Sequence, residues 1–318
     1  MVLCSSLEKP KNFLPKRSSY ARVIRVHACP LNSFQGDRKT LTSKTLIETL
    51  GKWSRLVIYS KSVSALSAPK ENHIAKEWND AAESWVDFVR QGKDYFRDEL
   101  NTPGMLRLIG NVKGLEVLDV ACGEGYHTRI LARRGAKATG IDLSRELVEH
   151  AKSQEKKDRL GIRYYVSNSA DLSRFPAKCF EVVTCFMALM DIEDYRGTIS
   201  EVTRVMKDDG RFIFSIIHPC FDCIAKNGEI ERTARYFEVR DERVPWRMER
   251  LLRPFETTSF HRTLTDYSTA LYKHGLAIRR LLEPKPTRKG STKFPLLKQV
   301  LLRPHSIIFE TVKNTTKD

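Results

Sequence analysis

The sequence predicts an α/β fold in which a largely parallel β-sheet is covered by helices on both faces. From about residue 71 to residue 217, apolar strand-like runs alternate with helix-like segments. This alternation is typical of parallel strands joined by crossover helices. The last two strand-like runs, in contrast, have no helix-like segment between them, which favours an antiparallel pair at the end of the sheet.

The expected elements begin and end at residues that suit them. Residues 72–98 read as a first helix, because apolar side chains recur near 3.6-residue spacing. Ser144 suits the N-cap of another helix, and Thr263 and Asp266 have the spacing of a capping box. The expected strands are 115–121, 138–141, 162–167, 181–186, 211–217, 276–282 and 306–312, and the remaining expected helices are 126–134, 194–207 and 263–274.

Charge is unevenly distributed along the 318 residues, whose formal net charge is +16. Residues 1–70 hold 13 lysines and arginines against three acids and show no sustained periodicity. We therefore expect 1–70 to be a basic, disordered leader, with a mitochondrial-type transit peptide or a misassigned start as alternatives. The folded domain is expected over 71–318.

Composition narrows the class of protein. The chain is 41% hydrophobic and 30% charged, as in soluble globular proteins. No apolar run approaches the roughly 18 residues of a membrane span. Seven cysteines, an odd number, favour a reducing compartment over a disulfide framework. We expect a cytoplasmic protein, or a protein of the mitochondrial matrix if the leader is a transit peptide. The oligomeric state stays open.

Residues 115–125, Leu-Glu-Val-Leu-Asp-Val-Ala-Cys-Gly-Glu-Gly, are the most informative stretch. They read as an apolar strand ending in a glycine turn, which lets the backbone approach a ligand closely. A dinucleotide site needs a third glycine where Thr128 stands, so that fingerprint fails. Asp119 within the strand and Asp142 at the end of the next strand nevertheless favour a cofactor site.

Four segments resemble those of class I S-adenosylmethionine-dependent methyltransferases, over roughly residues 72–313. They are Val117–Gly125, with Ala121 where the first glycine usually stands, Gly140–Ser144, Ala170–Leu172, and Glu201–Phe212, with Asp208-Asp209 in place of Pro-Gly. The resemblance implies a doubly wound, seven-stranded Rossmann-like sheet with a reversed last strand. It also implies S-adenosyl-L-methionine as the cofactor.

The resemblance assigns cofactor contacts to individual residues. Asp142 is expected to accept hydrogen bonds from both ribose hydroxyls, because a carboxylate has two acceptor oxygens. Asp171 and the backbone of Ala170 are expected at the adenine edge. Asp119 is expected to hold the ligand's ammonium or to position the turn. The other expected cofactor-binding residues are Ala121, Cys122, Gly123, Gly125, Leu143, Phe186, Met187 and Trp78, with core packing as the alternative for the last three.

The segment after the fifth strand is expected to determine which acceptor is methylated. His218 and His261 are the candidate general bases, each with a structural role as the alternative. Residues 219–262 are expected to form a lid-like insertion over the acceptor pocket. Their basic excess favours an anionic small-molecule acceptor, and a solvated charged surface is the alternative.

Other functions are weighed against this one. His218-Pro-Cys220-Phe-Asp-Cys223 contains a C-x-x-C pair, but no second pair has finger spacing, so no metal site is expected. Phe186-Met-Ala-Leu189 replaces the family's N-P-P-Y-type motif, which favours small-molecule O-, N- or C-methylation. The alternatives are a nucleic-acid or protein methyltransferase that docks through basic segments, a non-catalytic cofactor-binding protein and, more remotely, a nicotinamide oxidoreductase.

Overall fold

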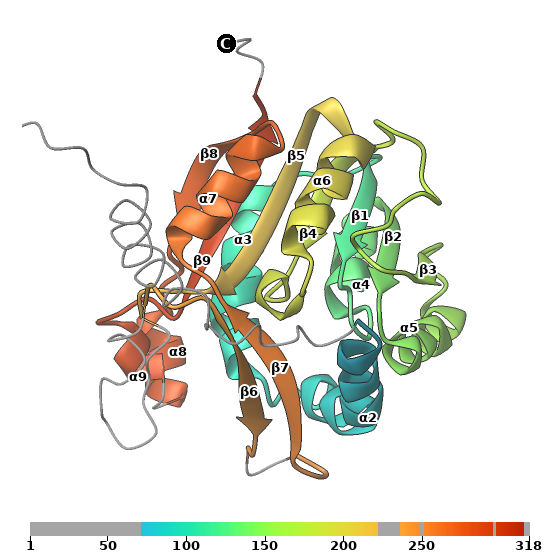
Figure 1. Ribbon diagram of the computed structural model, residues 1–318. Coiled ribbons are helices and arrows are strands. Elements are labelled where there is room, and N and C mark those ends of the chain that lie inside the picture. The colour runs from blue at the N-terminus through green and yellow to red at the C-terminus, as the bar shows by residue number, and fades with distance from the viewer. Residues whose placement is uncertain (1–70, 222–235, 249–250, 295–296, 315–318) are drawn as a thin grey trace, which may run out of the picture. The chain divides into compact units, whose positions relative to one another are not determined.

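Figure 1 shows a computed structural model that describes residues 71–221, 236–248, 251–294 and 297–314. These residues belong to one unit, Leu66–Asp318. The expected leader over 1–70 lies outside the described residues, so its character and the boundary at residue 71 stay predictions. Within the described ranges, no helix combines the length and the apolar composition needed to cross a membrane.

A seven-stranded sheet with strand order β3-β2-β1-β4-β5-β9-β8 forms the centre of this unit. The strands are β1 (Glu116–Val120), β2 (Lys137–Asp142), β3 (Arg163–Val166), β4 (Phe180–Cys185), β5 (Met206–Ile217), β8 (Leu276–Leu282) and β9 (Ser306–Lys313). The first five pair in parallel, whereas β9 is antiparallel to both β5 and β8. This confirms the predicted doubly wound α/β fold with a reversed strand.

Helices cover both faces of the sheet (Figure 1). The helices of the described ranges are α2 (Glu71–Arg90), η2 (Arg97–Asn101), α3 (Thr102–Ile109), α4 (Tyr126–Arg133), α5 (Arg145–Asp158), η3 (Leu189–Asp191), α6 (Tyr195–Val205), α7 (Leu264–Lys273), α8 (Arg288–Lys293) and α9 (Leu297–Val300). Neighbouring strand residues face opposite layers: Leu118 packs with α6 and α7, whereas Val117 packs with α3 and α4. The central strands are therefore apolar on both faces.

The predicted helix caps are present. The hydroxyl of Ser144 accepts a hydrogen bond from the backbone N–H of Leu147 at the start of α5. Thr263 and Asp266 form the expected capping box at the start of α7. Both caps satisfy backbone N–H groups that have no partner within the helix.

The first helix is shorter than the predicted 72–98. It ends at Arg90, and Gly92 then adopts a left-handed conformation with φ of +64°. This allows the backbone N–H of Lys93 to reach the carbonyl of Phe88 at 3.3 Å, which closes the helix. Gly92 was the sequence signal for the end of this helix. The helical segment over 97–109 was not predicted.

Two further boundaries differ from the prediction. β5 begins at Met206, so Asp208-Asp209-Gly210 belong to the strand, and a register shift against β4 between Phe180 and Val182 accommodates them. The connection between β8 and β9, expected to be free of helix, contains α8 and α9. The two strands are nonetheless antiparallel, as predicted.

The described part of the insertion over 219–262 contains a separate antiparallel pair, β6 (Arg240–Trp246) and β7 (Phe255–His261). Trp246 packs against Trp78 and Trp85 of α2, with ring centroids 6.5 and 5.3 Å apart. Residues 222–235 and 249–250 lie outside the described residues. A lid formed by the whole insertion therefore stays a prediction.

Candidate functional site

A pocket of about 470 Å³ lies where β1, β2, β3 and β4 end. Its lining includes Ala121 after β1, Asp142 at the end of β2, Ser167 after β3 and Met187 after β4. Doubly wound folds bind ligands at this edge of the sheet. The volume is within the usual range for small-molecule sites, roughly 300–1,000 Å³.

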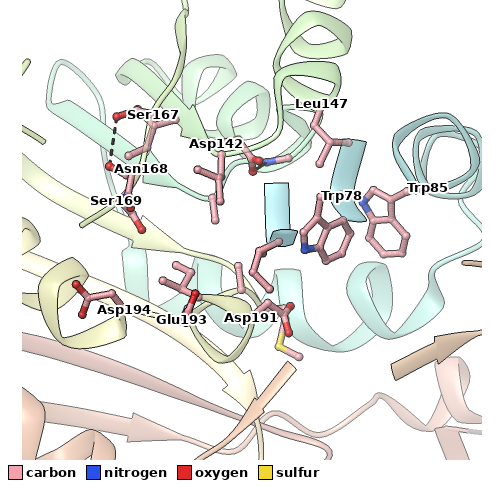
Figure 2. A pocket seen from close by; sticks show the side chains of 18 residues that line it. Trp78, Trp85, Asp142, Leu147, Ser167, Asn168, Ser169, Asp191, Glu193 and Asp194 are labelled. Atoms are coloured by element: carbon pink, nitrogen blue, oxygen red, sulfur yellow. Dashed lines mark hydrogen bonds between the residues drawn. The ribbon is translucent and has the colours of Figure 1, made fainter. Parts of the chain in front are cut away.

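Two further segments line the pocket, and Figure 2 shows them on different sides of it. Ile74, Trp78 and Trp85 form the α2 wall, in which the two tryptophan rings pack edge to face with centroids 6.2 Å apart. Residues 191–194, Asp-Ile-Glu-Asp, form the 191–194 wall. With Asp142, this wall brings four acidic residues to the lining, of which Asp194 also accepts a hydrogen bond from the backbone N–H of Gly197 at the start of α6. No lysine, arginine or histidine is among the described residues that line the pocket.

The glycine turn contributes backbone to the pocket at Ala121 and Gly123. Both residues have positive φ, +53° and +56°. A Cβ added to Gly123 would meet no protein atom within 4 Å, so this position faces open space. A Cβ on Gly125 would lie 2.4 Å from the hydroxyl oxygen of Tyr164. Gly125 does not line the pocket; it is a glycine because Tyr164 packs against it.

Asp142 connects the turn to the next helix and lines the pocket. Its Oδ2 accepts a hydrogen bond from the backbone N–H of Gly123, and its Oδ1 accepts one from that of Ser144, both at 2.8 Å. Burial raises the pKa of the Asp142 carboxyl, and these backbone N–H groups oppose the shift. The structure thus brings Asp142 together with four other predicted residues: Leu143, Ala121, Gly123 and Met187.

Trp78 also lines the pocket, whereas Phe186 does not. Phe186 is buried and its ring stacks on that of His127, with centroids 3.8 Å apart. Cys122 is buried as well and packs beneath the turn with Tyr164. For Phe186 and Cys122, core packing is the role that the structure supports.

The predicted adenine residues lie beyond the pocket. Asp171 is exposed, and its Oδ1 accepts a hydrogen bond from the backbone N–H of Ser173 at 3.1 Å. Neither Asp171 nor Ala170 lines the pocket; Ser167, Asn168 and Ser169 do. The reason is that β3 ends at Val166, so the three residues directly after it occupy the sheet edge. The end of the strand therefore predicts which residues line the pocket better than the Ala-Asp-Leu motif does.

Neither predicted base reaches the pocket. His218 is buried, with Nε2 3.0 Å from Oε1 of Glu283 and Nδ1 accepting a hydrogen bond from the backbone N–H of Cys220. Burial lowers the pKa of His218. Nε2 of His261 lies 2.9 Å from the carbonyl oxygen of Tyr236. These contacts support the structural alternative for both histidines, and a role as general base stays a prediction.

No group of three or more metal-ligating side chains occurs among the described residues. Cys220, of the C-x-x-C pair, is a free thiol, and Cys223 lies outside the described residues.

Asp119 lies behind the turn rather than in the pocket. Its two carboxyl oxygens accept hydrogen bonds from the hydroxyls of Thr128 in α4, at 2.6 Å, and Thr184 in β4, at 2.9 Å. It thereby joins three elements beneath the turn. Of its two expected roles, positioning the turn is the one that these contacts support.

Burial, with a smaller contribution from the nearby Asp142 carboxylate, raises the pKa of Asp119 from 3.8 to about 6. The folded protein then keeps this proton to a higher pH than the unfolded chain. The free energy of unfolding of the wild type should therefore fall by about 3 kcal/mol in all, relative to Asp119→Asn, as pH rises from about 3 to about 7. Urea unfolding of both proteins across this range measures the difference; parallel pH profiles would contradict it.

Comparison with known proteins shows the family to which the chain belongs. A protein-family model described as a methyltransferase domain matches residues 118–214. The ubiquinone biosynthesis O-methyltransferase of Coxiella burnetii (strain Dugway 5J108-111) is 31% identical over 160 residues, which cover 48% of this chain and 67% of that protein. The chain is a class I S-adenosylmethionine-dependent methyltransferase.

Two further similarities agree with this membership. A crystal structure of an S-adenosylmethionine dependent methyltransferase from Mesorhizobium loti has 25% sequence identity and a TM-score of 0.53, covering 66% of this methyltransferase and 95% of that chain. The demethylmenaquinone methyltransferase of Tropheryma whipplei (strain Twist) is 35% identical over 107 residues, which cover 34% of this methyltransferase and 44% of that protein.

The pocket of this methyltransferase suits its cofactor. Positive-φ backbone at Ala121 and Gly123 leaves open space above the turn. A carboxylate at the end of β2 provides acceptors for hydroxyl groups. The carboxylates and tryptophans suit a ligand that carries positive charge and an aromatic ring.

Proposed function

We propose that this methyltransferase transfers a methyl group to a small aromatic molecule that carries no negative charge. The observation that carries the proposal is the pocket lining, which combines two tryptophans with the three acidic residues of the 191–194 wall and contains no basic side chain among the described residues. The basic excess of the insertion predicted an anionic acceptor. The described lining offers no cationic group to such an acceptor.

The cofactor side of the proposal follows from the pocket's geometry. Asp142 holds the ribose hydroxyls with the remaining acceptor capacity of its two oxygens, since each oxygen already takes one backbone hydrogen bond. Asn168 and Ser169 border the adenine. Backbone at Ala121 and Gly123 lies beside the methionine part. S-adenosylmethionine supplies a methyl group on a positively charged sulfur, and the chain aligns the acceptor with it and excludes water, which can contribute roughly 7–11 kcal/mol.

The acceptor side follows from charge and shape. A carboxylate or phosphate group near Asp191, Glu193 or Asp194 would face charges of its own sign, which costs binding free energy. An aromatic ring, in contrast, can pack against the edge or face of Trp78 and Trp85. One relative is named a ubiquinone biosynthesis O-methyltransferase and another a demethylmenaquinone methyltransferase, and both names agree with an acceptor that contains a ring.

A matched pair of acceptors tests the proposal. Transfer of labelled methyl from S-adenosylmethionine is measured to catechol and to 3,4-dihydroxybenzoate, which share the same ring and hydroxyls but differ in one carboxylate. We expect the neutral ring to be methylated with a kcat/KM about tenfold higher or more, because repulsion worth about 1.4 kcal/mol gives that factor.

RNA and a bulk protein substrate are included in the same assay. Preference for the carboxylated ring would contradict the proposed acceptor class. Label transferred to RNA or protein but to neither ring would favour the macromolecular alternatives instead, and would overturn the proposal.

A further inference from the structure

We propose that Glu77 and Arg262 are positioning residues that use strand β7 to set the spacing between the two walls of the pocket. Neither residue lines the pocket. Glu77 connects β7 to the α2 wall, and Arg262, directly after β7, connects it to the 191–194 wall. The inference rests on the proposed use of this pocket for the methyl donor.

The contacts of Glu77 join α2 to the β6–β7 pair. Its side chain is only 7% exposed. One carboxyl oxygen accepts a hydrogen bond from the backbone N–H of Thr258 in β7 at 2.7 Å, and the other accepts from the Thr258 hydroxyl at 3.1 Å. Arg243 of β6 pairs with the same carboxylate. Because Glu77 precedes Trp78 directly in α2, these bonds help to hold the α2 wall in place.

Two further side chains, His73 and Arg243, contact the Glu77 carboxylate or its partner Thr258. His73, one turn earlier in α2, lies with Nε2 2.7 Å from Oε1 of Glu77. The guanidinium of Arg243 also donates to the Thr258 hydroxyl at 3.1 Å. A buried carboxylate is stable only with such partners, so removing one oxygen acceptor should loosen α2 from β7.

The contacts of Arg262 hold the opposite wall. This arginine is 5% exposed, and its guanidinium donates to the backbone carbonyls of Leu189, at 3.1 Å, Ile192, at 2.7 Å, and Glu193, at 3.0 Å. It also packs over the ring of Tyr195, 4.1 Å from its centroid. The planar, rigid guanidinium can satisfy several carbonyls at once, which a lysine could not do in the same geometry.

These two sets of contacts make β7 a common support. One strand receives the α2 wall near its middle and the 191–194 wall at its end. A ligand that touches both Trp78 and Glu193 depends on their separation, which the backbone of β7 fixes. Loss of either contact should therefore weaken ligand binding without removing any group from the pocket.

The experiment compares Arg262→Met, Glu77→Gln and the double variant by calorimetry with S-adenosylhomocysteine, well below each melting temperature. We expect affinity to fall about tenfold for Arg262→Met and about fivefold for Glu77→Gln, as loss of charge-assisted hydrogen bonds implies. If both act through β7, the double variant should lose less than the product of the two single losses. Near-UV circular dichroism verifies that each variant is folded.

Arg253→Met is the matched control. Arg253 also joins the insertion to α2, but its side chain is 61% exposed and pairs with the exposed Glu83 at 3.3 Å. Such a pair contributes little, so affinity should stay at the wild-type value. Wild-type affinity in folded Arg262→Met and Glu77→Gln would overturn this inference while leaving the cofactor site intact. If Asp142→Ala also kept wild-type affinity, the proposed function itself would fail.

Discussion

Asp142→Ala is expected to reduce the affinity for S-adenosylhomocysteine by about 100-fold or more. The carboxylate holds the Gly123 and Ser144 backbone N–H groups and, in the proposed function, both ribose hydroxyls. Hydrogen bonds to a charged group contribute about 1.5–3 kcal/mol each, so losing two corresponds to at least that factor. Isothermal titration calorimetry measures the effect directly.

Asp171→Ala is the control for this substitution. Asp171 is the acid that the resemblance placed at the adenine edge, yet it is exposed and outside the pocket. Its loss should leave the affinity within about twofold of the wild type, since a surface substitution of this kind changes little. If Asp171→Ala weakened binding more than Asp142→Ala, the placement of the cofactor would be wrong.

Gly123→Ala should mainly weaken ligand binding, whereas Gly125→Ala should mainly destabilise the fold, although both glycines have positive φ. At Gly123 the new Cβ meets open space where the ligand is proposed to lie. We expect a stability loss of only about 1–2 kcal/mol from left-handed backbone strain. Affinity for S-adenosylhomocysteine should fall about tenfold or more, because the methyl group occupies the ligand's place.

At Gly125 the new Cβ would lie 2.4 Å from the Tyr164 hydroxyl oxygen and 2.8 Å from the ring carbon that bears it. Overpacking adds to the same backbone strain, so the stability loss should be larger, about 2–5 kcal/mol. Urea unfolding and calorimetry on both variants separate the two effects. Equal loss of stability, with no difference in affinity, would contradict the different roles assigned to the two glycines.

The fold was predictable because its signals are local. The apolar run before Ala121, the N-cap at Ser144 and the capping box at Thr263 each specify an element from adjacent residues. The end of the first helix was missed even though Gly92 marks it. The apolar positions at helical spacing end at Val89, and the prediction nevertheless extended the helix past Gly92 to residue 98.

The site was predictable only in part, because a pocket depends on contacts between distant segments. Asp142 ends β2 and Gly123 follows β1, so their positions in the sequence were enough to place both at the sheet edge. Asp191 and Glu193 were missed, since nothing near them in sequence shows that the segment after β4 lines the same pocket as α2. Arg262 was missed for the same reason: its partners lie about 70 positions away.

The two histidines were predicted from their positions in the sequence alone. His218 follows the fifth strand, where a base would suit the chemistry, but it is directed to Glu283 in the segment after β8. Position along the chain placed it at the correct end of the sheet. The partner that holds it there could be found only in three dimensions.

A crystal structure with S-adenosylhomocysteine tests the central claim most directly. We predict that both ribose hydroxyls lie within hydrogen-bond distance, about 2.5–3.2 Å, of the Asp142 carboxylate. The adenine should lie beside Asn168 and Ser169, and the methionine part beside Ala121 and Gly123. If the ribose of the ligand lay away from Asp142 in that crystal structure, the account would be contradicted.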